Sequence, residues 1–177
     1  MGKIDTFALT PKALGSLALV QPFSDSRGWS MNDIYAWARD RFKTEAKLVS
    51  AGIHSGGKKY SPNTFSINFS KIYPGAIKAW HKHEKQDDYF FVLEGDAQVG
   101  LSNGSYTEKV FIGEHNQRVL HIPAGVWHGI TPVGDKPCSL LYLITNVYNP
   151  ENPDEIRATE EQILALEPAG FWDAENK

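Results

Sequence analysis

Three histidines near the middle of the chain constrain its fold more than any other feature. His81 and His83 stand at the end of one predicted strand, and His128 follows a Pro-x-Gly turn at the start of another. In a β-strand, residues two apart point to the same face, so His81 and His83 project together. A third imidazole, from His128, and a carboxylate, from Asp88, can then complete one polar cluster.

The spacing of these residues resembles the paired motifs of the cupin superfamily. The pattern G-x5-H-x-H, an acidic residue and x6-G is matched over 75–95, and P-x-G-x-x-H is matched over 123–128. Asp88 stands where glutamate is usual, and Pro132 stands where the second motif usually ends in asparagine. The resemblance implies a small β-barrel. Aspartate is one methylene shorter than glutamate, so the geometry must adjust for Asp88 to reach a metal ion.

Short apolar segments separated by turn residues predict an all-β fold. The predicted strands cover 65–72, 77–83, 89–93, 97–101, 109–112, 119–122, 129–133 and 139–145. Apolar runs over 5–30 predict an N-terminal strand or hairpin, helical spacing over 32–46 predicts a short helix, and 159–166 is a candidate C-terminal helix. The predicted fold class is therefore a cupin jelly-roll β-barrel with a short N-terminal helix and a C-terminal helical tail.

Length and composition favour one globular domain. The chain has 177 residues, of which 41% are hydrophobic, and we expect a single cupin domain over 1–177 with a barrel core over about 64–148. No apolar run approaches the roughly 18 residues that span a bilayer, and the first six residues lack the apolar core of a secretory signal. The net charge of −3 disfavours a broad nucleic-acid surface. We expect a cytoplasmic protein with neither a membrane nor a nucleic-acid partner, whose single cysteine, Cys138, is a buried structural thiol.

Five further segments of the chain carry distinctive residue patterns. They are D-S-R-G at 25–28, N-F-S at 68–70, I-K-A-W-H at 77–81, I-P-A-G-V-W-H-G-I at 122–130 and L-Y-L-I-T-N-V-Y-N-P at 141–150. Together they are similar to the signatures of the dTDP-4-dehydrorhamnose 3,5-epimerase family, cupin-fold enzymes of nucleotide-sugar metabolism. The resemblance implies a homodimer that binds a nucleotide-linked sugar and epimerises it by proton abstraction next to a keto group. The reaction would serve deoxysugar or polysaccharide biosynthesis and require no cofactor.

The same resemblance implies roles for particular residues. His81 is the expected base, because imidazole titrates near neutral pH, and Tyr142 is the expected acid. Lys78 is the third expected catalytic residue, and either Lys78 or His128 would support the enolate oxygen. The expected substrate-binding residues are Arg27, Asn68, Lys78 and His128.

Departures from the family pattern keep other functions open. Lys78 replaces the arginine beside the family's base, so a bidentate contact becomes a point charge. Asp88 stands where the family's Q-x-K-L-V motif has lysine, and the family's C-terminal S-x-K-D segment has no clear counterpart. His83 and Asp88 favour metal-binding cupins instead. W-H-K-H at 80–83 with N-P-E-N-P-D at 149–154 resembles the zinc-binding cupin domain of bacterial capsular-sugar epimerase/reductases.

Three hypotheses follow. The first is a metal-independent epimerase or ketoisomerase that acts on a nucleotide-linked keto sugar, with His81 as base. The second is a metal-dependent cupin isomerase or dioxygenase that holds Zn, Ni, Mn or Fe, since mixed nitrogen and oxygen ligation does not choose among these ions. Its ligands would be His81, His83, Asp88 and His128. The third is a non-catalytic sugar-binding cupin.

Overall fold

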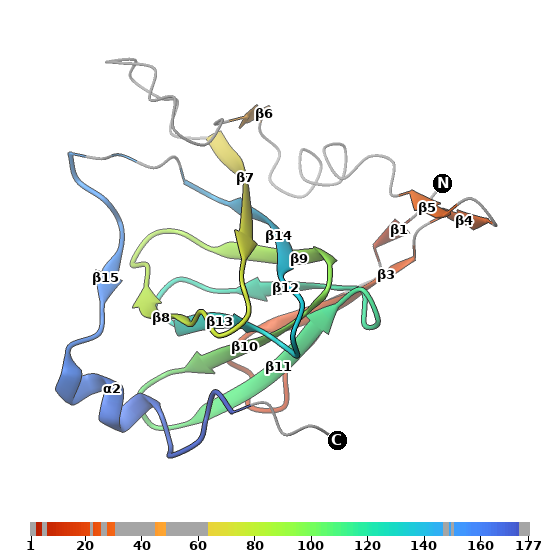
Figure 1. Cartoon of the computed structure of the whole chain (residues 1–177). Helices are drawn as coiled ribbons and strands as arrows, with labels where there is room; N and C mark the ends of the chain where they lie inside the picture. The colour runs from red at the N-terminus through yellow and green to blue at the C-terminus, as the bar shows by residue number, and fades with distance from the viewer. Residues whose placement is uncertain are drawn as a thin grey trace.

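The computed structural model describes residues 3–4, 7–21, 23–25, 28–30, 45–48, 64–146, 149 and 151–173 (Figure 1). The elements in chain order are β1 (Lys3–Ile4), β2 (Ala8–Leu9), β3 (Ser16–Gln21), β4 (Phe23–Asp25), β5 (Gly28–Ser30), β6 (Glu45–Leu48), β7 (Thr64–Ile72), β8 (Lys78–Lys82), β9 (Asp88–Glu94), β10 (Asp96–Ser102), β11 (Thr107–Gly113), β12 (Arg118–Ile122), β13 (Trp127–Pro132), β14 (Cys138–Ile144), β15 (Ile156–Arg157) and α2 (Glu160–Leu166).

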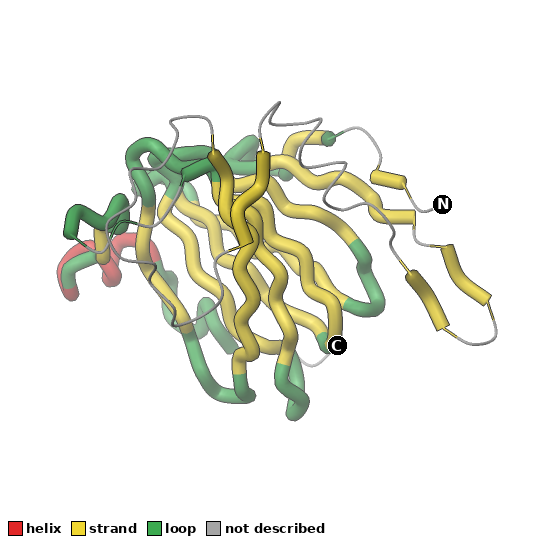
Figure 2. Tube along the Cα trace, turned by 90° about the horizontal axis from the view of Figure 1, so that it is seen from above, coloured by secondary structure: helices red, strands yellow, loops and turns green. Residues whose placement is uncertain are grey.

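Two large sheets form the body of the molecule (Figures 1 and 2). One has the order β1-β3-β12-β9-β14-β7-β6, with β2 also paired to β3, and the other has the order β11-β10-β13-β8-β15. The strands pair antiparallel within them, apart from the parallel pair β6 and β7. Neighbouring strands are mostly far apart in sequence, as in a jelly roll. The described residues include no helix with the length and apolar character needed to cross a membrane.

The eight predicted strands are confirmed as β7 to β14, with bounds within two residues of those expected. The N-terminal hairpin is confirmed as β4 and β5, and the C-terminal helix as α2. Thr159 caps α2, since its hydroxyl accepts from the Gln162 backbone N–H and the Gln162 side chain accepts in return. Of the expected helix over 32–46, residues up to 44 lie outside the described part of the chain. Its expected end is wrong, because residues 45–46 belong to β6, which pairs with β7.

The main core lies between the two sheets. Its buried residues are Leu14, Ile72, Phe90, Val92, Ala97, Val99, Leu101, Val110, Ile112, Leu120, Ile122, Ile130, Cys138 and Leu140. Apart from Leu14, they come from strands of both sheets, so burial of these apolar side chains holds the sheets face to face. Cys138 is fully buried among them, as expected of a structural thiol.

An aromatic cluster packs on the outer face of the five-stranded sheet. It contains Trp80, Trp127, Leu166, Phe171 and Trp172, so α2 and the turn after it cover β8 and β13. A Cβ atom at Gly100 would lie 2.6 Å from Trp80 and 2.7 Å from Phe171, so glycine is what lets these rings approach the sheet. With Trp80 anchored outside, the histidines beside it in β8 face the interior.

Candidate functional site

A cavity of about 980 Å³ opens into the barrel between the two sheets. This volume is at the upper end for small-molecule sites, which typically measure about 300–1,000 Å³. Its lining includes most of the residues that the sequence singled out: Asn68, Lys78, His81, His83, Asp88 and Tyr142. Arg27 lies outside the described residues.

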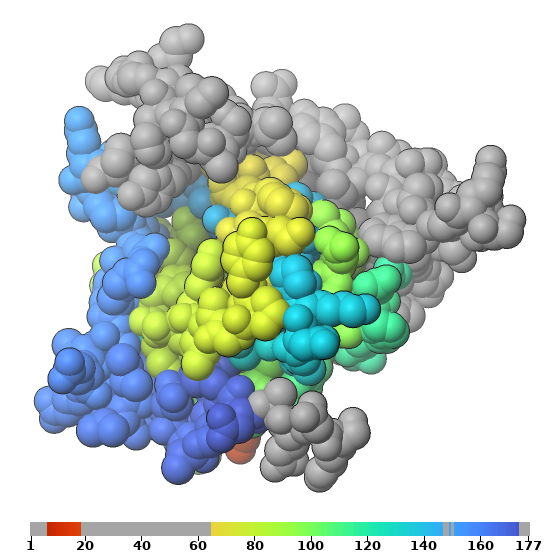
Figure 3. Space-filling view, in the orientation of Figure 1, coloured from red at the N-terminus to blue at the C-terminus, as the bar shows by residue number. Residues whose placement is uncertain are grey.

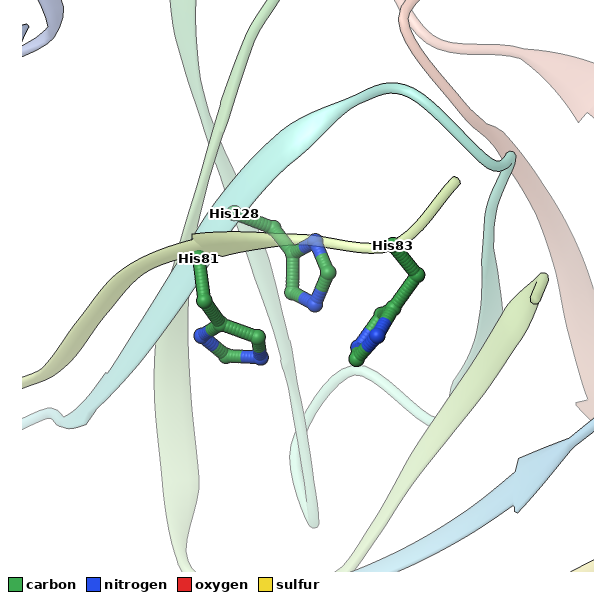
Figure 4. A group of neighbouring side chains, drawn as sticks. All are labelled: His81, His83 and His128. Atoms are coloured by element: carbon green, nitrogen blue, oxygen red, sulfur yellow. The ribbon is translucent and has the colours of Figure 1, made fainter. Parts of the chain in front are cut away.

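Three imidazoles meet beside this cavity: His81 and His83 line it, and His128 is buried next to them, outside its lining (Figure 4). His81 lies in β8 and His83 directly follows that strand, while His128 of β13 stands directly opposite His81 in the strand pairing. One ring nitrogen of each histidine lies within 4.8 Å of the others. The ring centroids of His81 and His128 are 4.2 Å apart. The strand parity and the Pro-x-Gly turn therefore produce the convergence that the sequence predicts.

Backbone carbonyls orient two of the three rings. Nδ1 of His128 lies 3.0 Å from the carbonyl oxygen of Val126, and Nδ1 of His83 contacts the carbonyl oxygen of Asp154. A carbonyl oxygen can only accept, so each Nδ1 carries a proton. In a neutral ring the other nitrogen, Nε2, then presents a lone pair, and the two Nε2 atoms face the cluster.

Asp88 completes the cluster from the start of β9. Its Oδ2 lies 3.3 Å from Nε2 of His128 and 3.6 Å from Nε2 of His83, while its Oδ1 accepts from the Gln86 amide at 2.7 Å. The contact with His128 lacks hydrogen-bond geometry, and Nε2 of His128 is buried with no hydrogen-bond partner in the described part of the chain. Asp88 thus reaches the histidines although its side chain is one methylene shorter than the glutamate usual at this position.

This donor set fits a divalent metal ion. Neutral imidazole nitrogens and a carboxylate are ligands of Zn, Ni, Mn and Fe in proteins, and a hydrogen-bonded Nδ1 is typical of a ligating histidine. Lone pairs that face one another in a buried space also need a positive charge between them, whether a proton or a metal ion. His81, His83, His128 and Asp88 are the residues that would hold it.

The surroundings of His81 lower its pKa to about 2. Burial is the largest cause, followed by the neighbouring His128 and His83 and by Arg157, since all of these disfavour a charged ring. The expectation that His81 titrates near neutral pH is therefore wrong. In the protein without substrate its imidazole is neutral at physiological pH.

Tyr142 shares the inner face of the other sheet with Asn68, its partner in the pairing of β14 with β7. Burial raises the pKa of the Tyr142 phenol, and the carboxylates of Asp88 and Glu155 raise it further, against a hydrogen bond with Ser70. The phenol therefore keeps its proton at neutral pH. Lys78 is exposed and lines the cavity from the start of β8.

The sequence did not identify the cavity wall formed by residues 152–157. β15 pairs Arg157 with His81 and Ile156 with Lys82, which places this segment along the cavity. It lies on the left of the barrel in Figure 3, in blue. The only sequence signal was the N-P-E-N-P-D run, because a two-residue exposed strand has no recognisable alternation.

Comparison with known proteins agrees with this architecture. Residues 58–156 match the family described as polysaccharide biosynthesis C-terminal domain. The spore coat polysaccharide biosynthesis protein SpsL of Bacillus subtilis is 41% identical over 116 residues, which cover 61% of this chain and 74% of SpsL. The probable low-salt glycan biosynthesis epimerase Agl13 of Haloferax volcanii is 40% identical over 97 residues, which cover 50% of this chain and 62% of Agl13.

Solved structures share the fold at low sequence identity. The dTDP-6-deoxy-D-glucose-3,5-epimerase of Legionella pneumophila, in complex with dTDP-4-keto-L-rhamnose, is 18% identical with a TM-score of 0.63, over 92% of this chain and 81% of that one. The structural likeness confirms the jelly-roll fold implied by the epimerase resemblance. From the match over residues 58–156 and the similarity to SpsL, the chain belongs to the polysaccharide biosynthesis C-terminal domain family.

Proposed function

We propose that this chain is an epimerase of nucleotide-linked keto sugars in deoxysugar or polysaccharide biosynthesis. One observation carries the proposal: a neutral imidazole, His81, and a protonated phenol, Tyr142, line the same cavity. Epimerisation next to a ketone needs a group that accepts an α-proton and a group that donates one. The names of related proteins support the same reaction class, since Agl13 and the Legionella protein are both called epimerases.

In this proposal His81 removes the proton and Tyr142 returns one from the other face of the sugar. Lys78 lies at the cavity wall, where its ammonium can stabilise the negative charge on the enolate oxygen. General acid–base groups of this kind contribute about 10²–10⁴-fold each to the rate. Asn68 and His128 complete the substrate-binding set, with Arg27 as a further residue from outside the described part of the chain.

The low pKa of His81 is compatible with a base only when substrate is bound. A nucleotide diphosphate brings negative charge, and enolate formation adds more beside the ring. Opposite charge nearby favours a protonated imidazole and raises its pKa. His81 would then accept the proton in the complex although it stays neutral in the protein alone.

Solvent exchange tests the proposal. A dTDP-linked 4-keto-6-deoxyhexose incubated with the protein in deuterated buffer should lose its C3 or C5 proton signals in the NMR spectrum. dTDP-glucose, which has no ketone, is the control and should keep all its proton signals. The absence of exchange with 4-keto nucleotide sugars would contradict the epimerase proposal.

A second candidate is a metal-dependent cupin enzyme, favoured by Nε2 of His128, which faces Asp88 and has no hydrogen-bond partner in the described part of the chain. In it the four clustered side chains hold Zn, Ni, Mn or Fe, and such an ion would polarise a substrate oxygen as a Lewis acid. Metal analysis of protein purified without a histidine tag tests this candidate. One equivalent of a transition metal that is lost in His128→Ala supports it, and protein without bound metal contradicts it.

Three further expectations belong to the proposal: one domain over residues 1–177, a homodimer, and a cytoplasmic location. The dimer would cover a sheet edge that otherwise exposes unpaired backbone groups. Light scattering should give twice the chain mass at micromolar concentration. The mass of a single chain would contradict the dimer.

A further inference from the structure

Asp154 lies where the segment after β14 returns to the cavity. A turn precedes it, in which the Asn152 N–H donates to the Asn149 carbonyl at 3.2 Å and the Glu151 N–H donates to the Asn149 side chain at 3.0 Å. β15 follows it and pairs with β8. Asp154 is thus held from both sides next to the end of β8, where His83 directly follows the strand.

Asp154 contacts three consecutive residues at that end of β8. Its carboxylate accepts from two successive backbone N–H groups, Glu84 to Oδ1 at 3.0 Å and Lys85 to Oδ2 at 2.9 Å. Its backbone carbonyl accepts from Nδ1 of His83. One residue therefore binds the turn after His83 through its side chain and the His83 ring through its main chain.

These contacts decide which nitrogen of His83 enters the cluster. With Nδ1 held by the Asp154 carbonyl, Nε2 points toward Asp88, at 3.6 Å from Oδ2. If the turn at residues 84–85 separated from the carboxylate, the carbonyl would move away with it. The His83 ring would then lose the acceptor that fixes its tautomer.

We propose that Asp154 is a positioning residue for the histidine cluster, because its carboxylate holds the turn after β8 so that its carbonyl orients His83. The importance of this role for catalysis rests on the proposed function. The role itself is a property of the protein alone and is measured without substrate.

Asp154→Ala and Asp154→Asn test the role, and Glu151→Ala is the matched control. Glu151 is an exposed acid on the same segment, and its backbone rather than its side chain takes part in the turn. Nitrogen-15 NMR of the histidine side chains reports which ring nitrogen carries the proton. The wild type and Glu151→Ala should show His83 as the Nδ1–H tautomer, and Asp154→Ala should show a mixture of both tautomers.

Amide hydrogen exchange provides the second measurement. The Glu84 and Lys85 amides should exchange about tenfold faster or more in Asp154→Ala, because each loses a charge-assisted hydrogen bond. Asp154→Asn keeps one oxygen acceptor, so one of the two amides should exchange more slowly than in Asp154→Ala. The tautomer ratio of His83 should lie between those of the wild type and Asp154→Ala. It also serves as the test if Asp154→Ala does not fold.

The wild-type tautomer of His83 in the folded Asp154 variants would overturn the proposal, even if the two amides exchanged faster, since Asp154 would then support only the turn. A wild-type protein without epimerase activity whose His83 still depends on Asp154 would leave the positioning role intact. That result would contradict the proposed reaction alone.

Discussion

Nε2 of His128 lies 3.3 Å from Oδ2 of Asp88, and both side chains are almost completely buried. The Asp88 carboxylate is almost fully buried, and its other oxygen accepts from the Gln86 amide. Such a pair is stable only when a positive charge lies between the two atoms or when the pair is part of a larger set of partners. Asp88 should therefore affect both the stability of the protein and the charge at the histidine cluster.

Asp88→Ala should lower the free energy of unfolding by about 1–3 kcal/mol, since the buried Gln86 amide loses its acceptor. Chemical denaturation measures the change. Asp88→Asn keeps an oxygen near Gln86 and should recover part of the loss, and Asp135→Ala, in an exposed turn, should change stability little. An Asp88→Ala protein as stable as the wild type would contradict this role.

Glu167 should contribute to stability on the opposite face of β8. Its Oε2 accepts from the indole N–H of Trp80 at 3.1 Å and of Trp172 at 2.9 Å. Glu167→Ala leaves both indoles without this acceptor, so we expect a loss of about 1–3 kcal/mol and a shift in tryptophan fluorescence. Glu161→Gln, exposed on α2, is the control and should cost less. Unchanged stability and fluorescence in Glu167→Ala would exclude this contribution.

Cys138 should resist alkylation in the folded protein. Burial raises the pKa of its thiol from 9.0 to about 11, so at pH 8 about one thiol in a thousand is ionised. Iodoacetamide at pH 8 should label the protein in urea but not in native buffer, as followed by mass spectrometry. The unfolded thiol ionises first as pH rises, so this group should also reduce stability between about pH 9 and 11. Native labelling at the rate of a free thiol would contradict the burial of Cys138.

The features of this structure that depend on residues close together in the chain were predictable from the sequence. Short apolar segments bounded by turn residues mark β7 to β14 in the sequence, although β9, β10 and β13 are buried almost throughout and show no alternation. Strand parity predicted that His81 and His83 share a face. The C-terminal helix at 159–166 was also predicted, whereas its cap at Thr159 was not.

The remaining features depend on contacts between distant residues. β15 has no alternation of its own and exists because it pairs with β8 some 70 residues away, the same separation at which Asp154 meets His83. The pKa of His81 is lowered by its burial and by His128 and Arg157, which no local pattern places beside it. The acceptor role of Glu167 likewise requires the packed aromatic cluster.

Tyr142→Phe should separate the two halves of the proposed reaction. Removal of the phenol proton donor leaves His81 able to form the enolate, so exchange of the substrate proton with solvent should continue while epimer formation slows by about 10²–10⁴-fold. NMR follows both processes in one sample. Equal slowing of exchange and product formation would mean that Tyr142 acts before or during enolate formation.

The most direct test of the proposed function is proton exchange measured on wild type and His81→Asn after dialysis against a chelator. We expect the dialysed wild type to exchange the C3 or C5 proton of a dTDP-linked 4-keto-6-deoxyhexose at its original rate. His81→Asn should exchange it at least about 10²-fold more slowly, because the base is lost. Exchange that stops on chelation and returns with added metal, or that proceeds at the wild-type rate in His81→Asn, would contradict a metal-independent reaction with His81 as its base.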